Sequence, residues 1–225
     1  GELKQEVSLA LQDLELKQLL DRFSDGNPTP GGGSAAATSA ALAASLVAMA
    51  ARVTANNKKF ADKAERMDKL AQDADARREE LANLIDADTK AYDGVSAAFK
   101  MPKETDDQKA ERSQAIRAAM KNAAEVPLST METALEVLKL SADVVEHGNP
   151  NCVTDAVSSC LLAEAGFESS MLNVCINLDS IRDKKYTDAM MERVVTLKKK
   201  AAMLVNKVRL SYNSSQCGCE LRADK

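Results

Sequence analysis

A run of glycines between a proline and an alanine-rich stretch is the first candidate for chemistry. Pro30 is followed by Gly31, Gly32 and Gly33, and Ser34 precedes the alanines. Glycine lets a ligand or a second backbone approach closely, and serine is a favoured N-cap. The segment therefore predicts a helix start after Ser34 whose free amides and positive dipole end can hold an anion. A flexible turn is the alternative interpretation.

Asp88 places a carboxylate in a row of apolar residues. It shares one helical face with Leu81, Ile85, Tyr92 and Val95, so it is expected to face the interior. A buried carboxylate needs hydrogen bonds or a partner, and burial raises its pKa. Such a group is a natural general acid or base. The alternative is a structural carboxylate bonded to the end of a neighbouring helix.

A later apolar segment carries a polar face at helical spacing. Asp155, Ser159, Gly166, Asn173 and Asn177 fall on this face, while leucines occupy the others. The pattern predicts a lined pocket rather than a solvated surface. The alternatives are hydrogen bonds between helices and, for Asp155, stabilisation of the first helical turn.

His147, the only histidine, lies just before a turn that contains Asn149 and Pro150. Its imidazole could move protons near neutral pH, or it could simply complement a helix dipole. The sequence shows no nucleophile–base pair, phosphate-loop lysine or metal-ligand cluster, so no metal is expected. From the residues alone, the chain is a helical enzyme or binder with a glycine loop and interior carboxylates.

The elements that must position these residues are all helical. Aromatic residues make up only 3% of the chain and tryptophan is absent, so the core must be built from Leu, Val, Ala and Met, which suits packed helices. We predict an all-α fold, a bundle of about six helices with long antiparallel members. One domain is expected over 1–225, with a loose tail at 213–225 and a break or kink at Pro127. The predicted helices cover approximately 11–23, 34–54, 59–99, 106–145, 152–178 and 186–211.

Composition argues against several classes of partner. The net charge is -4 and no segment is strongly basic, so no nucleic-acid partner is expected. The uncharged run between Asp25 and Arg52 could span a membrane, but alanine is only marginally apolar, and a buried central helix is favoured. Cys152, Cys160 and Cys175 have apolar neighbours and are expected to be reduced. The odd cysteine count and the lack of a signal peptide predict a cytoplasmic location.

In their order along the chain, these motifs resemble the cyclodeaminase family. That family includes the cyclodeaminase half of formiminotransferase-cyclodeaminase and free-standing methenyltetrahydrofolate cyclohydrolases. The resemblance covers roughly residues 8–212, with Thr154 where relatives usually have serine. The matching segments are Pro28–Ser34, Asp88-Thr89-Lys90-Ala91-Tyr92, Met101-Pro102-Lys103, Ala123–Pro127, Gly148-Asn149 to Asp155, and Asn173–Leu178.

The resemblance implies a homodimer that acts on a reduced folate at the bridge between N5 and N10. The preferred activity is formimidoyltetrahydrofolate cyclodeaminase, which closes 5-formiminotetrahydrofolate to 5,10-methenyltetrahydrofolate and releases ammonia. The alternatives are methenyltetrahydrofolate cyclohydrolase and a non-catalytic helical dimer that binds folate or a protein. A tetrahydrofolate derivative is then the substrate, and a formiminotransferase could be a partner. The smooth alanine stripe from Ala37 to Ala55 would suit a close dimer contact.

The expected site combines both lines of argument. Asp88 and Asp155 are predicted to line one pocket and to handle the proton in bridge closure or opening, with His147 as a third catalytic candidate. Lys103 could meet the anionic glutamate tail of folate. The predicted substrate-binding residues are Pro30, Gly31, Gly32, Gly33, Ser34, Tyr92, Lys103, Asn149, Asn173 and Asn177.

Overall fold

The computed structural model describes residues 9–215, which form α-helices and short 3-10 helices with no strand in that range. The predicted all-α bundle with six helices is confirmed. The helices are α1 (Leu16–Ser24), α2 (Gly32–Ala55), α3 (Ala64–Phe99), α4 (Asp106–His147), α5 (Val153–Asp179) and α6 (Lys184–Ser215). Three 3-10 helices accompany them: η1 (Leu11–Asp13) precedes α1, η2 (Lys58–Lys63) lies between α2 and α3, and η3 (Pro150–Cys152) lies between α4 and α5.

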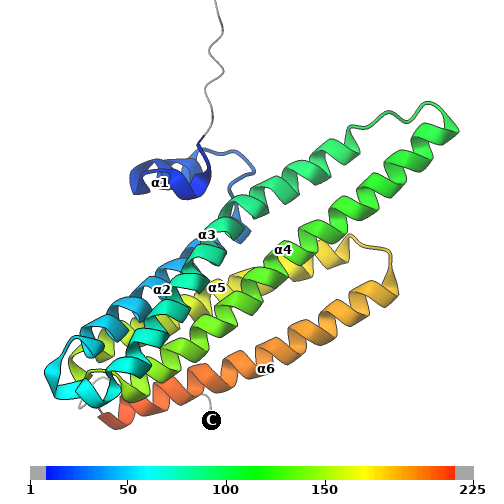
Figure 1. Cartoon of the computed structure of the whole chain (residues 1–225). Helices are drawn as coiled ribbons and strands as arrows, with labels where there is room; N and C mark the ends of the chain where they lie inside the picture. Colours follow the sequence, from blue (N-terminus) through cyan, green and yellow to red (C-terminus); the bar gives the residue numbers. More distant parts are fainter. Residues whose placement is uncertain (1–8, 216–225) are drawn as a thin grey trace, which may run out of the picture.

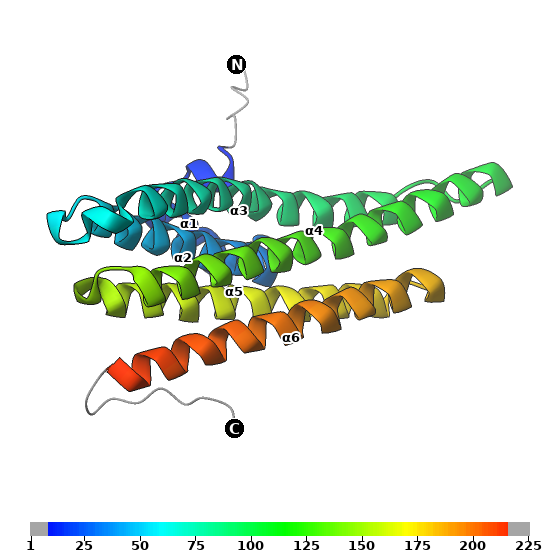
Figure 2. The same ribbon diagram turned by 60° about the horizontal axis from the view of Figure 1, so that its bottom comes forward.

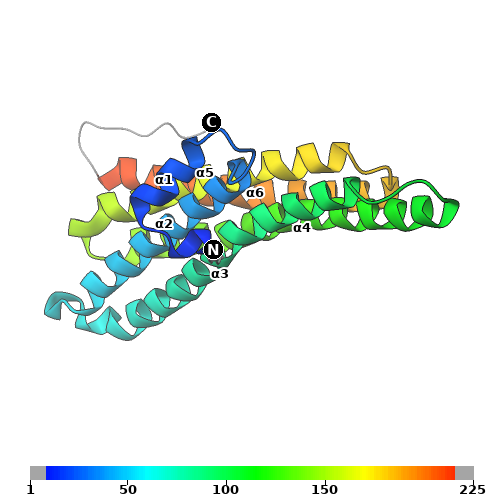
Figure 3. The same cartoon turned by 90° about the horizontal axis from the view of Figure 1, so that it is seen from above.

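Five long helices lie alongside one another, and the short α1 sits on the outside of the bundle (Figure 1). Helix α2 packs chiefly against α3 and α5, while α4 packs against α3 and α5, and α6 against α4 and α5. The α3–α4 hairpin extends past the ends of α5 and α6 (Figure 2). Seen from above, α1 lies over the part of the bundle that contains α2 (Figure 3).

Helix α2 is packed through its small side chains. Most of its alanines are buried, and a Cβ at Gly166 of α5 would lie 2.8 Å from the Ala36 carbonyl oxygen and 3.0 Å from the Ala40 Cβ. The two backbones can approach this closely only because one residue lacks a side chain. The helix is long and apolar enough to cross a membrane by length and composition, but its small-residue faces are covered by neighbouring helices.

The outer face of α2 carries the larger side chains. Leu42, Met49 and Val53 are exposed, although their spacing is that of an apolar stripe. The close helix approach that the alanine stripe predicts is therefore made within the chain, mainly by α3 and α5. The exposed row remains available to another surface.

Several predicted boundaries were wrong for local reasons. The first predicted helix is split into η1 and α1, because the buried Asp86 carboxylate accepts the Leu11 amide at 2.8 Å and holds a separate turn. The long third helix starts only at Ala64, since Phe60 has non-helical backbone angles. The predicted loose tail is helical as far as Ser215, and the two cysteines of that tail, Cys217 and Cys219, lie outside the described residues.

Pro127 does not break α4, which continues on both sides of it. Proline lacks an amide hydrogen, so the carbonyl of Ala123, four residues earlier, loses its helical partner. Asn177 of α5 supplies the missing donor, because its Nδ2 lies 2.6 Å from the Ala123 oxygen. The proline of one helix and the asparagine of the next thus form one structural unit.

We expect Asn177→Ala to lower the free energy of unfolding by about 1–3 kcal/mol, because it leaves the Ala123 carbonyl unpaired. In a Pro127→Ala background the new amide of residue 127 can donate to Ala123, so the same change should have a much smaller effect. Urea denaturation of the four proteins measures this coupling. Strictly additive effects would show that the two residues act separately.

Candidate functional site

The carboxylate of Asp88 on α3 closes the N-terminus of α2. Its Oδ2 accepts the Ser34 amide at 2.9 Å, and the Ser34 hydroxyl lies 3.0 Å from the same oxygen. That hydroxyl can also donate to the Ile85 carbonyl, 2.9 Å away. Helix α2 begins at Gly32 with Gly31 as a side-chain-free N-cap, so the prediction that Ser34 is the N-cap was wrong. Asp88, from another helix, does the capping instead.

Gly33 leaves the room that this contact requires. A Cβ at this position would overlap the Asp88 carboxylate. At Gly32 the same atom would meet only Asn173, with Nδ2 3.4 Å away. The two adjacent glycines therefore leave room for different neighbours. Gly33 makes room for the Asp88 carboxylate of α3, and Gly32 lies against the Asn173 side chain of α5.

These five residues, Gly32, Gly33, Ser34, Asp88 and Asn173, form what we call the glycine–aspartate centre. In the described part of the chain, no hydrogen bond uses the amides of Gly32 or Gly33, or the second carboxylate oxygen of Asp88. The Asn173 Nδ2 donates to the Ser169 carbonyl, which leaves its oxygen as an acceptor. The centre thus combines unused backbone donors with an unused carboxylate oxygen.

Burial raises the pKa of Asp88, and the two hydrogen bonds from Ser34 only partly offset this. A carboxylate with a raised pKa is a stronger base once it is ionised. The donors beside it can stabilise negative charge on a reacting oxygen. The arrangement suits proton transfer at an atom that is also held by backbone amides.

Tyr92 lies one turn of α3 beyond Asp88, but its side chain is 47% exposed. The prediction that it faces the interior with Asp88 was wrong, because the stripe turns toward solvent at this end of α3. Its ring is placed where it could contact a molecule bound at the centre.

Asp155 and His147 lie at the opposite end of the bundle. Asp155 is in the first turn of α5, 18 residues before Asn173, which is about 27 Å along a helix. Ala123 of α4 lies near the centre, because it is bonded to Asn177, one turn of α5 after Asn173. His147 ends α4 24 residues after Ala123, which is about 36 Å along the helix. Within one chain, the structure does not bring Asp155 or His147 to Asp88.

The remaining polar candidates make structural contacts. Asn149 donates its amide to Thr54 at 2.9 Å and caps η3 through its side chain. Ser159 donates to the Ser141 hydroxyl at 2.8 Å, so part of the polar face of α5 serves helix packing. Lys103 is exposed in the turn between α3 and α4, beyond the end of the helix that carries Asp88.

Sequence reasoning missed Asp86, whose buried carboxylate anchors η1. Asp86 lies outside the row of apolar residues that contains Asp88, so the helical spacing of apolar residues did not indicate that it is buried. Among residues 9–215, no group of three or more His, Cys, Asp or Glu side chains could hold a metal ion. Cys152 and Cys160 are buried free thiols, and Cys175 is half-buried and free.

Residues 15–196 match the family model described as formiminotransferase-cyclodeaminase. The chain is 34% identical over 193 residues to a methenyltetrahydrofolate cyclohydrolase of Methylorubrum extorquens. The matched region covers 86% of this chain and 93% of that protein. It is 29% identical over 192 residues to the formimidoyltransferase-cyclodeaminase of Rattus norvegicus, but spans only 36% of that longer protein.

A solved structure agrees with the fold. The crystal structure of a formiminotetrahydrofolate cyclodeaminase from Thermotoga maritima superposes with a TM-score of 0.82 at 25% sequence identity. The match covers 91% of this chain and 98% of the other.

We expect Gly33→Ala to be less stable than Gly32→Ala by about 1 kcal/mol, the typical effect of losing a helix cap. The Cβ at residue 33 pushes the Asp88 carboxylate away from Ser34, whereas the Cβ at residue 32 fits with a small shift of Asn173. Both changes raise helix propensity equally, so their difference in urea denaturation isolates the clash. Equal stabilities would mean that Asp88 does not cap α2.

Proposed function

Because the chain belongs to the formiminotransferase-cyclodeaminase family, we propose that it acts on the one-carbon bridge between N5 and N10 of tetrahydrofolate. The finer proposal is hydrolysis of 5,10-methenyltetrahydrofolate to 10-formyltetrahydrofolate. It rests on one observation, the 34% identity to a cyclohydrolase of almost the same length. The rat relative is less similar and much longer, and the Thermotoga maritima chain is of similar length but only 25% identical.

Asp88 is the base in this proposal. Water adds to the bridging carbon, and Asp88 accepts one of its protons while the amides of Gly32 and Gly33 face the new oxygen. The carbon–N5 bond then breaks, its electron pair stays on N5, and N5 takes the proton from Asp88. The formyl group remains on N10, and the second water proton goes to solvent.

The charge of the substrate matches the centre. The methenyl bridge shares a positive charge between N5 and N10, so an ionised carboxylate beside it favours binding. The raised pKa of Asp88 keeps that carboxylate basic enough to take a proton from the attacking water. Asn173 and the exposed ring of Tyr92 would hold the folate rings against the centre.

The second candidate is the cyclodeaminase reaction, which is the activity expected from the sequence motifs. In it N10 attacks the formimino carbon and its proton passes to the terminal nitrogen, which takes a second proton from solvent. The bond between the carbon and that nitrogen then breaks with its electron pair on the nitrogen, so ammonia leaves and the positively charged methenyl bridge remains. Its support is the Thermotoga maritima structure, a cyclodeaminase that the chain covers almost completely. The rat relative joins a transferase to its cyclodeaminase, so a formiminotransferase partner belongs to this candidate.

One pair of assays separates the candidates. The protein is given 5,10-methenyltetrahydrofolate and 5-formiminotetrahydrofolate separately, with EDTA present to test the expectation that no metal is required. Faster loss of the methenyl absorbance without ammonia supports hydrolysis. Ammonia release with a gain of methenyl absorbance supports the cyclodeaminase. Neither signal from folded protein would leave a folate-binding dimer, which a direct binding measurement then checks.

We expect Asp88→Asn to lower turnover by about a hundred- to ten-thousandfold, the usual contribution of a general base, while the fold survives. The control is Asp68→Asn, an exposed aspartate on the same helix. Wild-type turnover should fall as the pH drops through the raised pKa of Asp88, because the base becomes protonated. The variant should lack this acidic limb.

The raised pKa of Asp88 also determines whether the free energy of unfolding rises or falls with pH. The folded protein binds the Asp88 proton more tightly than the unfolded chain, so wild-type stability relative to Asp88→Asn should rise as the pH falls between the folded and unfolded pKa values.

Normal turnover in Asp88→Asn would remove Asp88 from the mechanism.

We further propose that the protein is a homodimer that uses the outer faces of α2 and α5. Leu42, Met49 and Val53 on α2 and Leu172 and Ile176 on α5 are exposed, and the two helices pack side by side. Large apolar side chains exposed on two adjacent helices are candidates for a protein interface.

We expect Leu42→Glu to give a monomer in light scattering, because it buries a charge in this interface. Met203→Glu, on the exposed face of α6, should leave the mass unchanged. A wild-type monomer at micromolar concentration would contradict the dimer. Loss of turnover in Asp155→Asn would indicate a site shared by two copies, since Asp155 is remote from Asp88 within one chain.

A further inference from the structure

The Ser34 hydroxyl has two acceptors at almost equal distance. Its Oγ lies 2.9 Å from the Ile85 carbonyl oxygen and 3.0 Å from Oδ2 of Asp88. The Thr89 hydroxyl, at 3.5 Å, is a weaker neighbour. A serine hydroxyl carries a single proton, so it makes a full hydrogen bond to only one acceptor at a time. Ser34 is completely buried, so bulk water does not compete for that proton.

The charge of Asp88 decides between the two acceptors. When the carboxylate is ionised, the hydroxyl donates to Oδ2, because a hydrogen bond to a charged acceptor is stronger than one to a neutral carbonyl. When Asp88 is protonated, this advantage disappears and the Ile85 carbonyl is the closer acceptor. The hydroxyl hydrogen can make this change by rotating about one bond, and neither α2 nor α3 has to move.

The two carboxylate oxygens of Asp88 differ in the donors that they meet. Oδ2 accepts the Ser34 amide at 2.9 Å as well as the Ser34 hydroxyl. Each of these bonds stabilises negative charge on Oδ2 and lowers its affinity for a proton. Oδ1 is the carboxylate atom nearest to the position that a Cβ of Gly33 would occupy. A proton that Asp88 accepts therefore binds to Oδ1, on the glycine side of the centre.

The helices packed on α3 bring no charged side chain to Asp88 that would override Ser34. Helix α2 carries no charged residue before Arg52, and Asn173, the α5 side chain of the centre, is neutral. Burial raises the pKa of Asp88, and the side-chain and backbone bonds from Ser34 are the causes that lower it. The Ser34 hydroxyl is thus the side chain that favours the ionised carboxylate.

The ionisable residues of α3 beside Asp88 face other surroundings. Asp86 is bonded to the amide of Leu11 in η1. Lys90 and Tyr92 are exposed to solvent. Asp88 is therefore the titrating group of its own helix that the Ser34 hydroxyl contacts.

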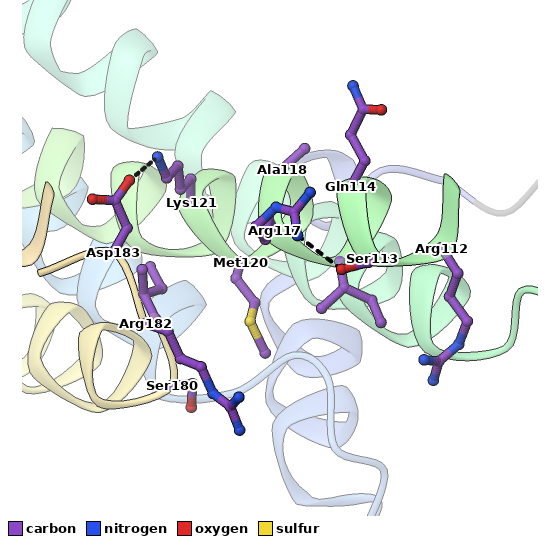
Figure 4. Close-up of a pocket in the computed structure, with 12 residues that line it drawn as sticks. Arg112, Ser113, Gln114, Arg117, Ala118, Met120, Lys121, Ser180, Arg182 and Asp183 are labelled. Carbon is purple, nitrogen blue, oxygen red and sulfur yellow. Dashed lines mark hydrogen bonds and ion pairs between the residues drawn. The ribbon is translucent and has the colours of Figure 1, made fainter. Parts of the chain in front are cut away.

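A further group of charges lines a cavity of about 890 Å³ between the N-terminal half of α4 and the turn that joins α5 to α6. Figure 4 shows Lys121 paired with Asp183, and Arg117 bonded to the Ser113 hydroxyl. The raised pKa of Asp88 arises from its burial, not from these charges. Removal of the Ser34 hydroxyl should therefore act on Asp88 without a compensating charge.

We propose that Ser34 is a positioning residue, which holds the ionised Asp88 carboxylate through Oδ2 and leaves Oδ1 to take up the proton. The use of Asp88 as a base rests on the proposed function. When Oδ1 takes a proton from the attacking water, the Ser34 hydroxyl turns to the Ile85 carbonyl. When that proton passes to N5, the hydroxyl returns to Oδ2. Each charge state of Asp88 thus leaves the buried hydroxyl with a hydrogen-bond acceptor.

The test compares the pH dependence of turnover in the wild type, Ser34→Ala and Ser45→Ala. Ser34→Ala removes a bond that favours the ionised carboxylate, so the pKa of Asp88 rises further and the acidic limb moves to higher pH. On this limb, turnover should fall by about tenfold relative to the wild type, the effect of one hydrogen bond to a charged group. The loss should shrink as the pH rises, because the base is then ionised in both proteins.

Ser45→Ala is the matched control, because its hydroxyl also lies on α2 but donates to the Ala41 carbonyl. It should keep the wild-type pH profile. Ser34→Cys keeps the shape of the side chain with a weaker donor, so its acidic limb should lie between those of the wild type and Ser34→Ala. Ser34→Cys also provides the test if the alanine variant does not fold. An equal loss of turnover at every pH in the Ser34 variants would overturn the proposal, since a purely structural role predicts it.

A second measurement does not depend on turnover. The Asp88 carboxyl group is titrated by NMR in protein that contains isotope-labelled aspartate, and its signal is identified by its absence from Asp88→Asn. We expect Asp88 to titrate at higher pH in Ser34→Ala than in the wild type and Ser45→Ala. The same titration in all three proteins would overturn the proposal, even in an active enzyme.

Failure of this proposal can be told apart from failure of the proposed function. A shifted Asp88 titration in Ser34→Ala, combined with normal turnover in Asp88→Asn, would refute the catalytic role of Asp88 but support the control of its charge by Ser34. An unshifted titration, combined with loss of turnover in Asp88→Asn, would keep Asp88 as the base and remove Ser34 from its control.

Discussion

The bond between the Asp88 carboxylate and the first turn of α2 is the contact on which the candidate site depends. It satisfies an amide that a glycine N-cap leaves open, and it fixes α3 against α2 at the position of the carboxylate. It also explains the adjacent sequence, because Gly33 must lack a side chain for the carboxylate to reach Ser34. A structural cap and a candidate base are thus the same group, one oxygen bonded to the helix and the other left for a ligand.

Small residues allow three helices to meet at this point. The buried alanines of α2 let α3 approach on one side, and Gly166 lets α5 approach on another. Close packing brings Asp88 and Asn173 to neighbouring glycines from different helices. Larger side chains on these faces would separate the helices and widen the centre, so its geometry follows from the packing of the whole bundle.

The sequence was sufficient to predict the helices and the burial that raises the pKa of Asp88, because both depend on a local periodicity of apolar residues. It could not predict contacts between helices. The acceptor of Ser34, the partner of Asn177 and the burial of Asp86 each depend on residues more than fifty positions away. Asp155 shows a prediction that went too far. The motifs suggested that it shares one site with Asp88, but the structure places it in the first turn of α5, far from Asp88.

The bond from Asn177 to Ala123 also has a consequence for motion. Elsewhere in a helix, a turn can open by breaking bonds with its own neighbours, but this turn of α4 is completed by a side chain of α5. Local opening of α4 near Pro127 therefore requires α5 to move as well. The two helices should fluctuate as one cooperative unit at this end, with linked protection of their amides from hydrogen exchange. A ligand held by Asn173 at the glycine–aspartate centre would rest on α5, so its binding should slow exchange in α4 and α5 together.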